Sequence, residues 1–181
     1  MGGPAGWLLI HAVFPLWFAA GLADWACHRA TRIAATSGLR ENLLHWVMFA
    51  ELGVGSLAVA LLEINAGVLL LVLAVFLVHE ATVWIDLRFT QPRRLILPIE
   101  QMVHSLQEIL PLAALLLLAV LAWDQTLAIV GAGAAQADFT LRWKDVPLPL
   151  PLLLGGAIAV ALVNVLPLAQ ETAACLRTRR G

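Results

Sequence analysis

The sequence predicts an all-α integral membrane protein with about five transmembrane helices, and three observations support this fold class. First, 61% of the 181 residues are hydrophobic and 13% are charged, whereas soluble domains carry about 25% charged residues. Second, five stretches are long and apolar enough to cross a bilayer, which takes roughly 20 residues each. Third, the basic residues gather on one side of those stretches. The net charge of -1, with no basic run between aromatics, argues against a nucleic-acid partner.

The five stretches form one membrane domain, 1–181, with short turns between the spans. The predicted spans are residues 7–28, 43–64, 66–87, 98–122 and 148–169. The turns are marked by Thr36-Ser37-Gly38, Asn65-Ala66-Gly67 and Gln91-Pro92-Arg93-Arg94. Pro98 suits the first turn of the fourth helix. Residues 1–6 lack the basic segment of a signal peptide, so the first apolar run is expected to remain as a span.

The distribution of Lys and Arg predicts the orientation in the membrane. Of the eleven basic residues, only Arg142 and Lys144 lie on the side of the long loop 124–147. By the positive-inside rule the N-terminus is outside and the C-terminus inside, in a bacterial inner (cytoplasmic) membrane. Cys27 and Cys175 would then face the cytoplasm and stay reduced. Within the outer loop, residues 138–144 alternate like a short strand that caps the bundle.

The informative feature is a set of ionisable residues at the predicted cytoplasmic ends of the first four spans. All five histidines and eight of the twelve acidic residues lie in the first 108 residues. Such groups cost several kcal/mol in hydrocarbon unless they are paired or bound to an ion. The candidate metal ligands are Asp24, His28, Glu41, His45, His79, Asp86, Glu100, His104 and Glu108.

The spacing of these residues directs them toward a common pocket. Residues four apart share one face of a helix, and this spacing separates Asp24 from His28 and Glu41 from His45. It also separates Glu100 from His104, and residues seven apart, as in the third span, share a face too. We therefore expect the first four spans to form an up-down bundle around a polar site.

Imidazole and carboxylate donors together suit iron, manganese or zinc, and carboxylates can bridge two ions. The number of candidate ligands predicts two transition-metal ions, with iron favoured over zinc or manganese. In this ligand pattern, residues 24–108 resemble the ferritin-type di-iron carboxylate bundles and the hemerythrin bundle. The pairs here read Asp/Glu-x-x-x-His, one residue wider than the ferritin motif. The resemblance implies a dinuclear site inside a four-helix bundle.

Four further residues are expected to support the site or its substrate. Glu80 is adjacent in sequence to His79 and either supports a ligand or faces a neighbouring helix. Trp25 and Trp84 fall among the candidate ligands and are expected to wall the pocket. Arg94 is a topology determinant that can also hold an anionic headgroup.

Several functions are compatible with this pattern. The leading hypothesis is a di-iron oxidoreductase, a hydroxylase or desaturase, that oxidises a lipid-phase substrate with electrons from a cytoplasmic donor. A zinc site would instead activate water for lipid hydrolysis. The pattern also allows a haem-b electron carrier, because paired histidines on membrane helices clamp haem, a metal transporter or sensor, and a metal-free network of ion pairs. The oligomeric state is not indicated.

Overall fold

Five helical segments are long and apolar enough to cross a membrane, as the sequence predicts, in a computed structural model that describes residues 3–180. The five segments are Gly3–Ala30, Leu39–Leu61, Ala66–Thr90, Pro98–Leu121 and Leu150–Arg179. The elements are α1 (Gly3–Leu8), η1 (Leu9–Val13), α2 (Phe14–Ala30), η2 (Ile33–Ala35), α3 (Leu39–Leu61), α4 (Ala66–Thr90), α5 (Pro98–Leu121), α6 (Trp123–Ile129), α7 (Leu150–Val160), η3 (Ala161–Val165) and α8 (Leu166–Arg180). The last span is the main surprise, because its helix continues well past residue 169.

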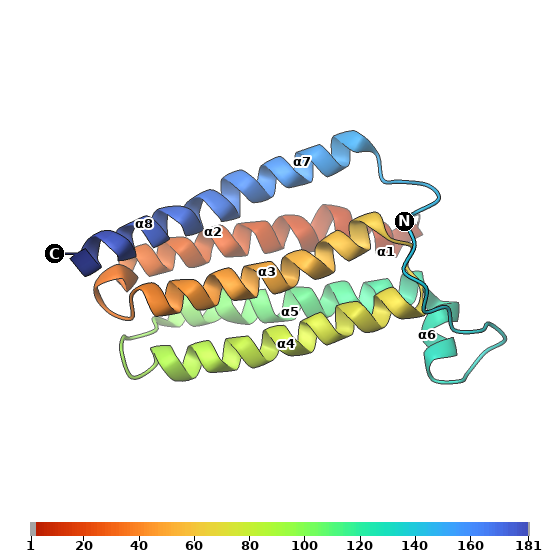
Figure 1. Ribbon diagram of the computed structural model, residues 1–181, viewed down its shortest axis with the longest axis horizontal. Helices are drawn as coiled ribbons and strands as arrows, with labels where there is room; N and C mark the ends of the chain where they lie inside the picture. The colour runs from red at the N-terminus through yellow and green to blue at the C-terminus, as the bar shows by residue number, and fades with distance from the viewer. Residues whose placement is uncertain (1–2, 181) are drawn as a thin grey trace.

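The long helices pack as a closed ring in which each runs antiparallel to its neighbours in sequence (Figure 1). Around the ring α2 contacts α5, α5 contacts α4, α4 contacts α3, α3 contacts α8, and α8 returns to α2. The bundle therefore has five members, because the fifth span completes it. We call the end that carries the connections 31–38 and 91–97 and the C-terminus the site end, and the other end the far end.

Local sequence explains where the helices begin. The side chain of Asn65 accepts a hydrogen bond from the amide of Val68, which caps α4. Gly38 precedes α3 with φ of 68°, a conformation that favours glycine. Pro98 occupies the first turn of α5, where its missing N–H costs nothing.

Two spans contain a π-helical turn, and each lies immediately before a proline. Residues 9–13 precede Phe14-Pro15, and residues 161–165 precede Leu166-Pro167. Proline lacks an N–H and its ring collides with the carbonyl four residues earlier, so the preceding turn widens into a π-helical one. Pro111, in contrast, lies inside the uninterrupted helix α5.

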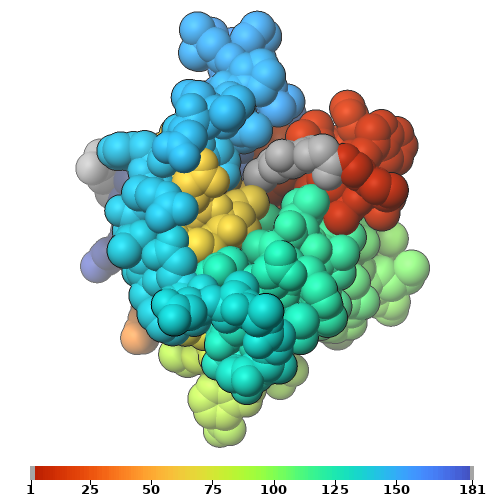
Figure 2. All heavy atoms as spheres, turned by 90° about the vertical axis from the view of Figure 1, so that its right-hand side faces the viewer, coloured from red at the N-terminus to blue at the C-terminus, as the bar shows by residue number. Residues whose placement is uncertain are grey.

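The connection between α5 and α7 folds back over the far end. Figure 2 views this end and shows the connection lying against the end of α3. The amide of Glu63 donates to the carbonyl of Arg142, and the amide of Lys144 donates to that of Leu61. The strand predicted over 138–144 is wrong, because in the described residues the segment forms a single isolated bridge, between Leu62 and Trp143.

The apolar core and the polar residues occupy different halves of the bundle. Leu9, Val59, Leu69, Leu110 and Leu118 are buried together in the far half. There α7 diverges from the bundle (Figure 1), and none of its described residues is buried. In the site-end half α8 packs closely against α2 and α3, which brings residues of the fifth span among the predicted ligands.

Candidate metal centre

Four of the predicted ligands, from α2 and α5, converge on one point. Asp24, His28, Glu100 and His104, which we call the first ligand group, each offer an atom within 4.8 Å of the others. His28 Nε2 lies 3.4 Å from Asp24 Oδ1 and 3.6 Å from Glu100 Oε1. In a tetrahedral site with metal–ligand bonds of about 2.1 Å, ligand atoms lie about 3.4 Å apart. The spacing suits a small metal ion, although Asp24 Oδ1 and His104 Nε2 are at hydrogen-bond distance, 3.0 Å.

Three more predicted ligands converge from α3 and α4. Glu41, His45 and Asp86, the second ligand group, also offer one atom each within 4.8 Å. His45 Nε2 lies 4.0 Å from Glu41 Oε1 and 3.7 Å from Asp86 Oδ2. The two groups adjoin, since the rings of His28 and His45 stack at 4.6 Å between centroids. Their arrangement provides two neighbouring positions, each with histidine and carboxylate donors.

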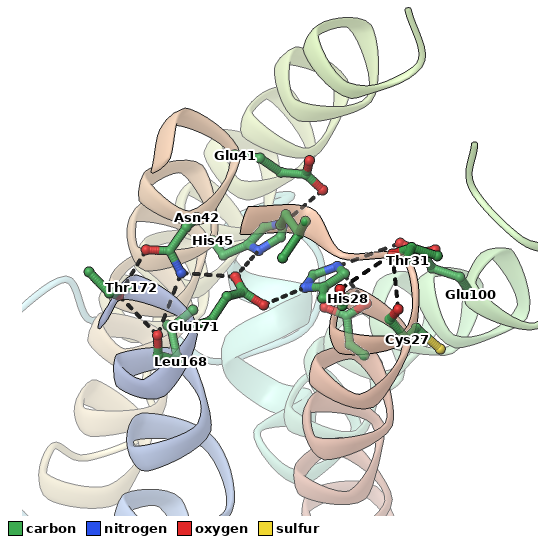
Figure 3. Close-up of polar contacts among 12 residues, drawn as sticks. Cys27, His28, Thr31, Glu41, Asn42, His45, Glu100, Leu168, Glu171 and Thr172 are labelled. Atoms are coloured by element: carbon green, nitrogen blue, oxygen red, sulfur yellow. Dashed lines mark hydrogen bonds and ion pairs between the residues drawn. The ribbon is translucent and has the colours of Figure 1, made fainter. Parts of the chain in front are cut away.

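Glu171 of α8 lies between the two groups and was missed by the sequence analysis (Figure 3). Its Oε2 is 3.0 Å from His28 Nδ1, and its Oε1 is 3.6 Å from His45 Nδ1. Both rings therefore turn Nδ1 toward Glu171 and Nε2 toward their own ligand group. A carboxylate that accepts the Nδ1–H of a histidine fixes the tautomer that leaves Nε2 free to bind a metal.

The position of Glu171 is itself fixed by α3. Asn42 Nδ2 donates to Glu171 Oε1 at 2.8 Å, and Thr172 donates its hydroxyl to Asn42 Oδ1. Trp46 Nε1 donates to the Thr172 hydroxyl oxygen at 2.9 Å. The available signal in the sequence was an acidic residue two positions past the predicted end of the fifth span, on the same side as the other ligands.

Arg94 reaches in from the connection 91–97 and joins the two groups. Its Nη2 is 2.6 Å from Glu41 Oε1 and 2.5 Å from Glu100 Oε1. Burial lowers the pKa of this guanidinium, but the hydrogen bonds that it donates to Glu41 and Glu100 outweigh that effect and leave the pKa above its ordinary value. Arg94 is thus a permanent cation whose first partners are protein carboxylates, and an ion in either group would share Glu41 or Glu100 with it.

Three buried atoms at the centre lack a hydrogen-bond partner among the described residues. They are His28 Nε2, Asp86 Oδ1 and Glu100 Oε2. Their side chains are almost fully enclosed, with residue exposures of 1%, 5% and 0%. Buried polar atoms are nearly always satisfied, so these atoms mark places in both ligand groups where a metal ion or water would complete the network.

Two predicted ligands lie away from both groups. His79 is seven residues before Asp86, which places it about 10 Å farther along the helix axis, and its Nδ1 lies 3.6 Å from Glu51 Oε2. Glu108, about 6 Å beyond His104 along α5, lines the same cavity but belongs to neither group. Their proposed ligand roles are therefore not supported by the distances.

Of the residues expected to support the site, some lie at the cavity and others lie away from it. Trp25 lines the cavity beside the first ligand group. Trp84 is 59% exposed, lies under the guanidinium of Arg88, and is not among the residues that line this cavity. Glu80 lies outside both groups and has a buried carboxylate oxygen without a hydrogen bond among the described residues.

A cavity of about 160 Å³ extends from the ligands toward the far end. His28, His45, Asp86 and His104 line it at the site end, and Phe49 and Leu52 are among its apolar walls farther in. A site with this shape can place an apolar molecule against the histidines and carboxylates while the helices exclude water.

Comparisons with protein families, with curated proteins and with solved structures found no match to this chain.

Proposed function

We propose that this chain is a membrane metalloprotein with a dinuclear His/carboxylate site near the cytoplasmic face, and that it acts as a di-iron oxidoreductase on a lipid or another hydrophobic substrate. The observation that carries the proposal is the pair of adjoining ligand groups joined by Glu171. Each group presents a free histidine Nε2 and at least two carboxylates, with distances of 3.4 to 4.0 Å from that Nε2 to its carboxylate partners.

The charge of the centre supports two divalent ions. It holds five largely buried carboxylates, those of Asp24, Glu41, Asp86, Glu100 and Glu171. Within the part of the chain that the structure describes, Arg94 is the one guanidinium paired with them, so four negative charges remain if the histidines are neutral. Two divalent cations would neutralise these charges, and neutral histidine is the form that binds metal. A metal-free ion-pair network would instead require protonated histidines within the membrane.

The protein's own residues would bind and orient the reactants. The Nε2 atoms and carboxylates of the two groups would hold the ions, while Glu171 keeps both imidazoles in the ligating tautomer. The apolar walls of the cavity would position a chain and exclude water. A bound iron pair would supply the oxidising chemistry: hydroxylation places one atom of dioxygen into a C–H bond, and the other leaves as water after two electrons and two protons arrive from a cytoplasmic electron carrier.

A haem site is disfavoured by the geometry of the histidines. His28 and His45 stack with 4.6 Å between their ring centroids and 10° between their planes, which leaves no space for a porphyrin between them. Zinc is compatible with the same donors, and the metal content of the protein distinguishes a hydrolase from an oxidoreductase.

The test is an oxidation assay on the iron-loaded protein in lipid nanodiscs, with dioxygen and a chemical reductant. We expect extracted lipids or added alkyl substrates to gain an oxygen atom or lose two hydrogens, in amounts that depend on reductant. His45→Ala should abolish the product, whereas His11→Ala, outside the centre, should retain it. Hydrolysis products with zinc-loaded protein, or no oxidation with two irons bound, would contradict the proposed reaction.

A further inference from the structure

The side chain of Asn164 faces the cavity without a partner. Asn164 lies in the π-helical turn of the fifth span and lines the cavity described above. Its Oδ1 is buried and has no hydrogen-bond partner among the described residues. It precedes Glu171 by seven residues, so it lies about 10 Å from the metal centre along the helix axis. An amide in this position requires a partner, because apolar surroundings penalise unpaired polar groups.

The neighbouring helix leaves room for this amide. A Cβ atom added to Gly21 of α2 would lie 2.0 Å from Asn164 Nδ2, closer than any non-bonded contact. Glycine at this position therefore allows Asn164 to lie between α2 and the cavity. Asn164 thus lies in the π-helical turn before Pro167 on its own helix and beside the missing side chain of Gly21 on the neighbouring helix.

A second polar group lies at the same depth on another helix. His79 of α4 precedes Asp86 by seven residues, lines the cavity, and is 5% exposed. Its Nδ1 has no hydrogen-bond partner among the described residues, and the nearest acidic atom is Glu51 Oε2 at 3.6 Å. We call Asn164 and His79 the second polar level of the cavity.

Beyond this level the interior becomes apolar again. A second cavity of about 40 Å³ shares Trp17 and Leu52 with the first and continues among Val59, Phe76 and Leu118 toward the far end. The interior thus offers a metal centre, a hydrogen-bonding level about 10 Å away, and an apolar end.

We propose that the second polar level binds the hydroxyl group of an uncharged, long-chain amphiphile, whose apolar chain occupies the cavities. A hydroxyl both donates and accepts a hydrogen bond, as do an amide and a neutral imidazole. Glu51 lies beside His79, and Glu108 lies in the cavity wall. A carboxylate or phosphate ligand would face these acidic side chains, which disfavours it. The inference rests on the proposed function for the reaction that follows, but the binding itself requires no metal.

Fluorescence quenching measures this binding directly, because Trp17 and Trp25 line the cavity. Bromoundecanol, bromoundecane and bromoundecanoic acid would be titrated into the protein in nanodiscs. The signal is the saturable quenching that disappears when both tryptophans are replaced by Phe. We expect the alcohol to bind about tenfold more tightly than the alkane, the order of magnitude for two hydrogen bonds, and more tightly than the acid.

Matched variants separate this inference from the metal proposal. Asn164→Leu and Gly21→Ala should each remove the preference for the alcohol, whereas Gly53→Ala, where an added Cβ meets nothing within 4 Å among the described residues, should retain it. Thermal melting identifies variants that fail to fold, and Asn164→Ala is the smaller replacement in that case. Equal binding of alcohol and alkane, tighter binding of the acid, or an unchanged preference in Asn164→Leu would overturn the inference. His45→Ala, which removes a metal ligand, should keep the preference, so a failed metal site and a failed ligand site give different results.

Discussion

Replacing Glu171 by glutamine should weaken metal binding at one ligand group and leave the other group nearly unchanged. Glu171 presents two acceptor oxygens, one at 3.0 Å from His28 Nδ1 and one that accepts from Asn42 Nδ2 at 2.8 Å and lies 3.6 Å from His45 Nδ1. Glutamine retains one acceptor and gains a donor. Its oxygen should remain beside the Asn42 amide, because two NH₂ groups would otherwise face each other. The new NH₂ group then faces His28.

The consequence falls on the first ligand group. Facing a donor, His28 Nδ1 must accept, so the proton moves to Nε2 and the atom that would bind metal is blocked. Loss of a supporting carboxylate of this kind weakens metal binding about 10- to 100-fold, or about 1.4 to 2.8 kcal/mol. The second ligand group keeps its histidine tautomer.

Titration of metal-free protein with Fe²⁺ or Zn²⁺ in detergent, followed by calorimetry, measures both affinities. We expect Glu171→Gln to bind one ion with nearly unchanged affinity and the other about 10- to 100-fold more weakly. Glu63→Gln, at the far end where Glu63 accepts from the amide of Asp145, is the matched control. Two unchanged affinities in Glu171→Gln would refute the role assigned to this carboxylate.

Three further predictions concern the surrounding structure. Arg94→Gln leaves two buried glutamates without their cation and should lower the free energy of unfolding of the metal-free protein by about 3 kcal/mol. The control Arg93→Gln should change this free energy by less than about 0.5 kcal/mol. Equal effects of the two variants in a denaturant titration would contradict the role of Arg94. Asn65→Ala removes the cap of α4 and the hydrogen bond to the Thr140 carbonyl. The free energy of unfolding should fall by about 1 to 2 kcal/mol, and the melting temperature should fall with it. An unchanged melting temperature would show that the cap is unimportant. Hydrogen bonds from Thr140 lower the pKa of Asp138 from 3.8 to about 2. The stabilisation of the loop by the ionised Asp138 side chain is therefore present above pH 3.8 and is lost as the pH falls toward 2. Limited acid proteolysis of the loop should therefore accelerate below about pH 4 in the wild type but not in Asp138→Asn, and a pH-independent difference between the two would contradict this.

The sequence predicted much of the centre because helix periodicity determines which residues share a face. The pairs Asp24/His28, Glu41/His45 and Glu100/His104 are four residues apart, and the structure brings each pair into one ligand group. His79 shows the limit of this reasoning. It shares a face with Asp86, but the rise of two helical turns separates it from that residue along the axis.

Glu171 could not be found from periodicity, because its place depends on contacts between helices distant in sequence. The apolar stretch of the fifth span ends near residue 169, yet α8 continues to Arg180. Contacts to α3, from Asn42 to Glu171 and from Trp46 to Thr172, accompany this continuation. Similarly, Pro15 and Pro167 follow π-helical turns whereas Pro111 does not, so proline alone does not predict the turn that contains Asn164.

Elemental analysis of the purified protein tests most directly whether the bundle holds two metal ions. Mass spectrometry would quantify iron, zinc and manganese per chain in the wild type, His45→Ala and His104→Ala. The ligand groups predict about two equivalents of transition metal in the wild type, with a substantial loss in each variant. A wild-type protein that folds normally and carries less than about one equivalent of any transition metal would contradict the claim and favour an ion-pair network around Arg94.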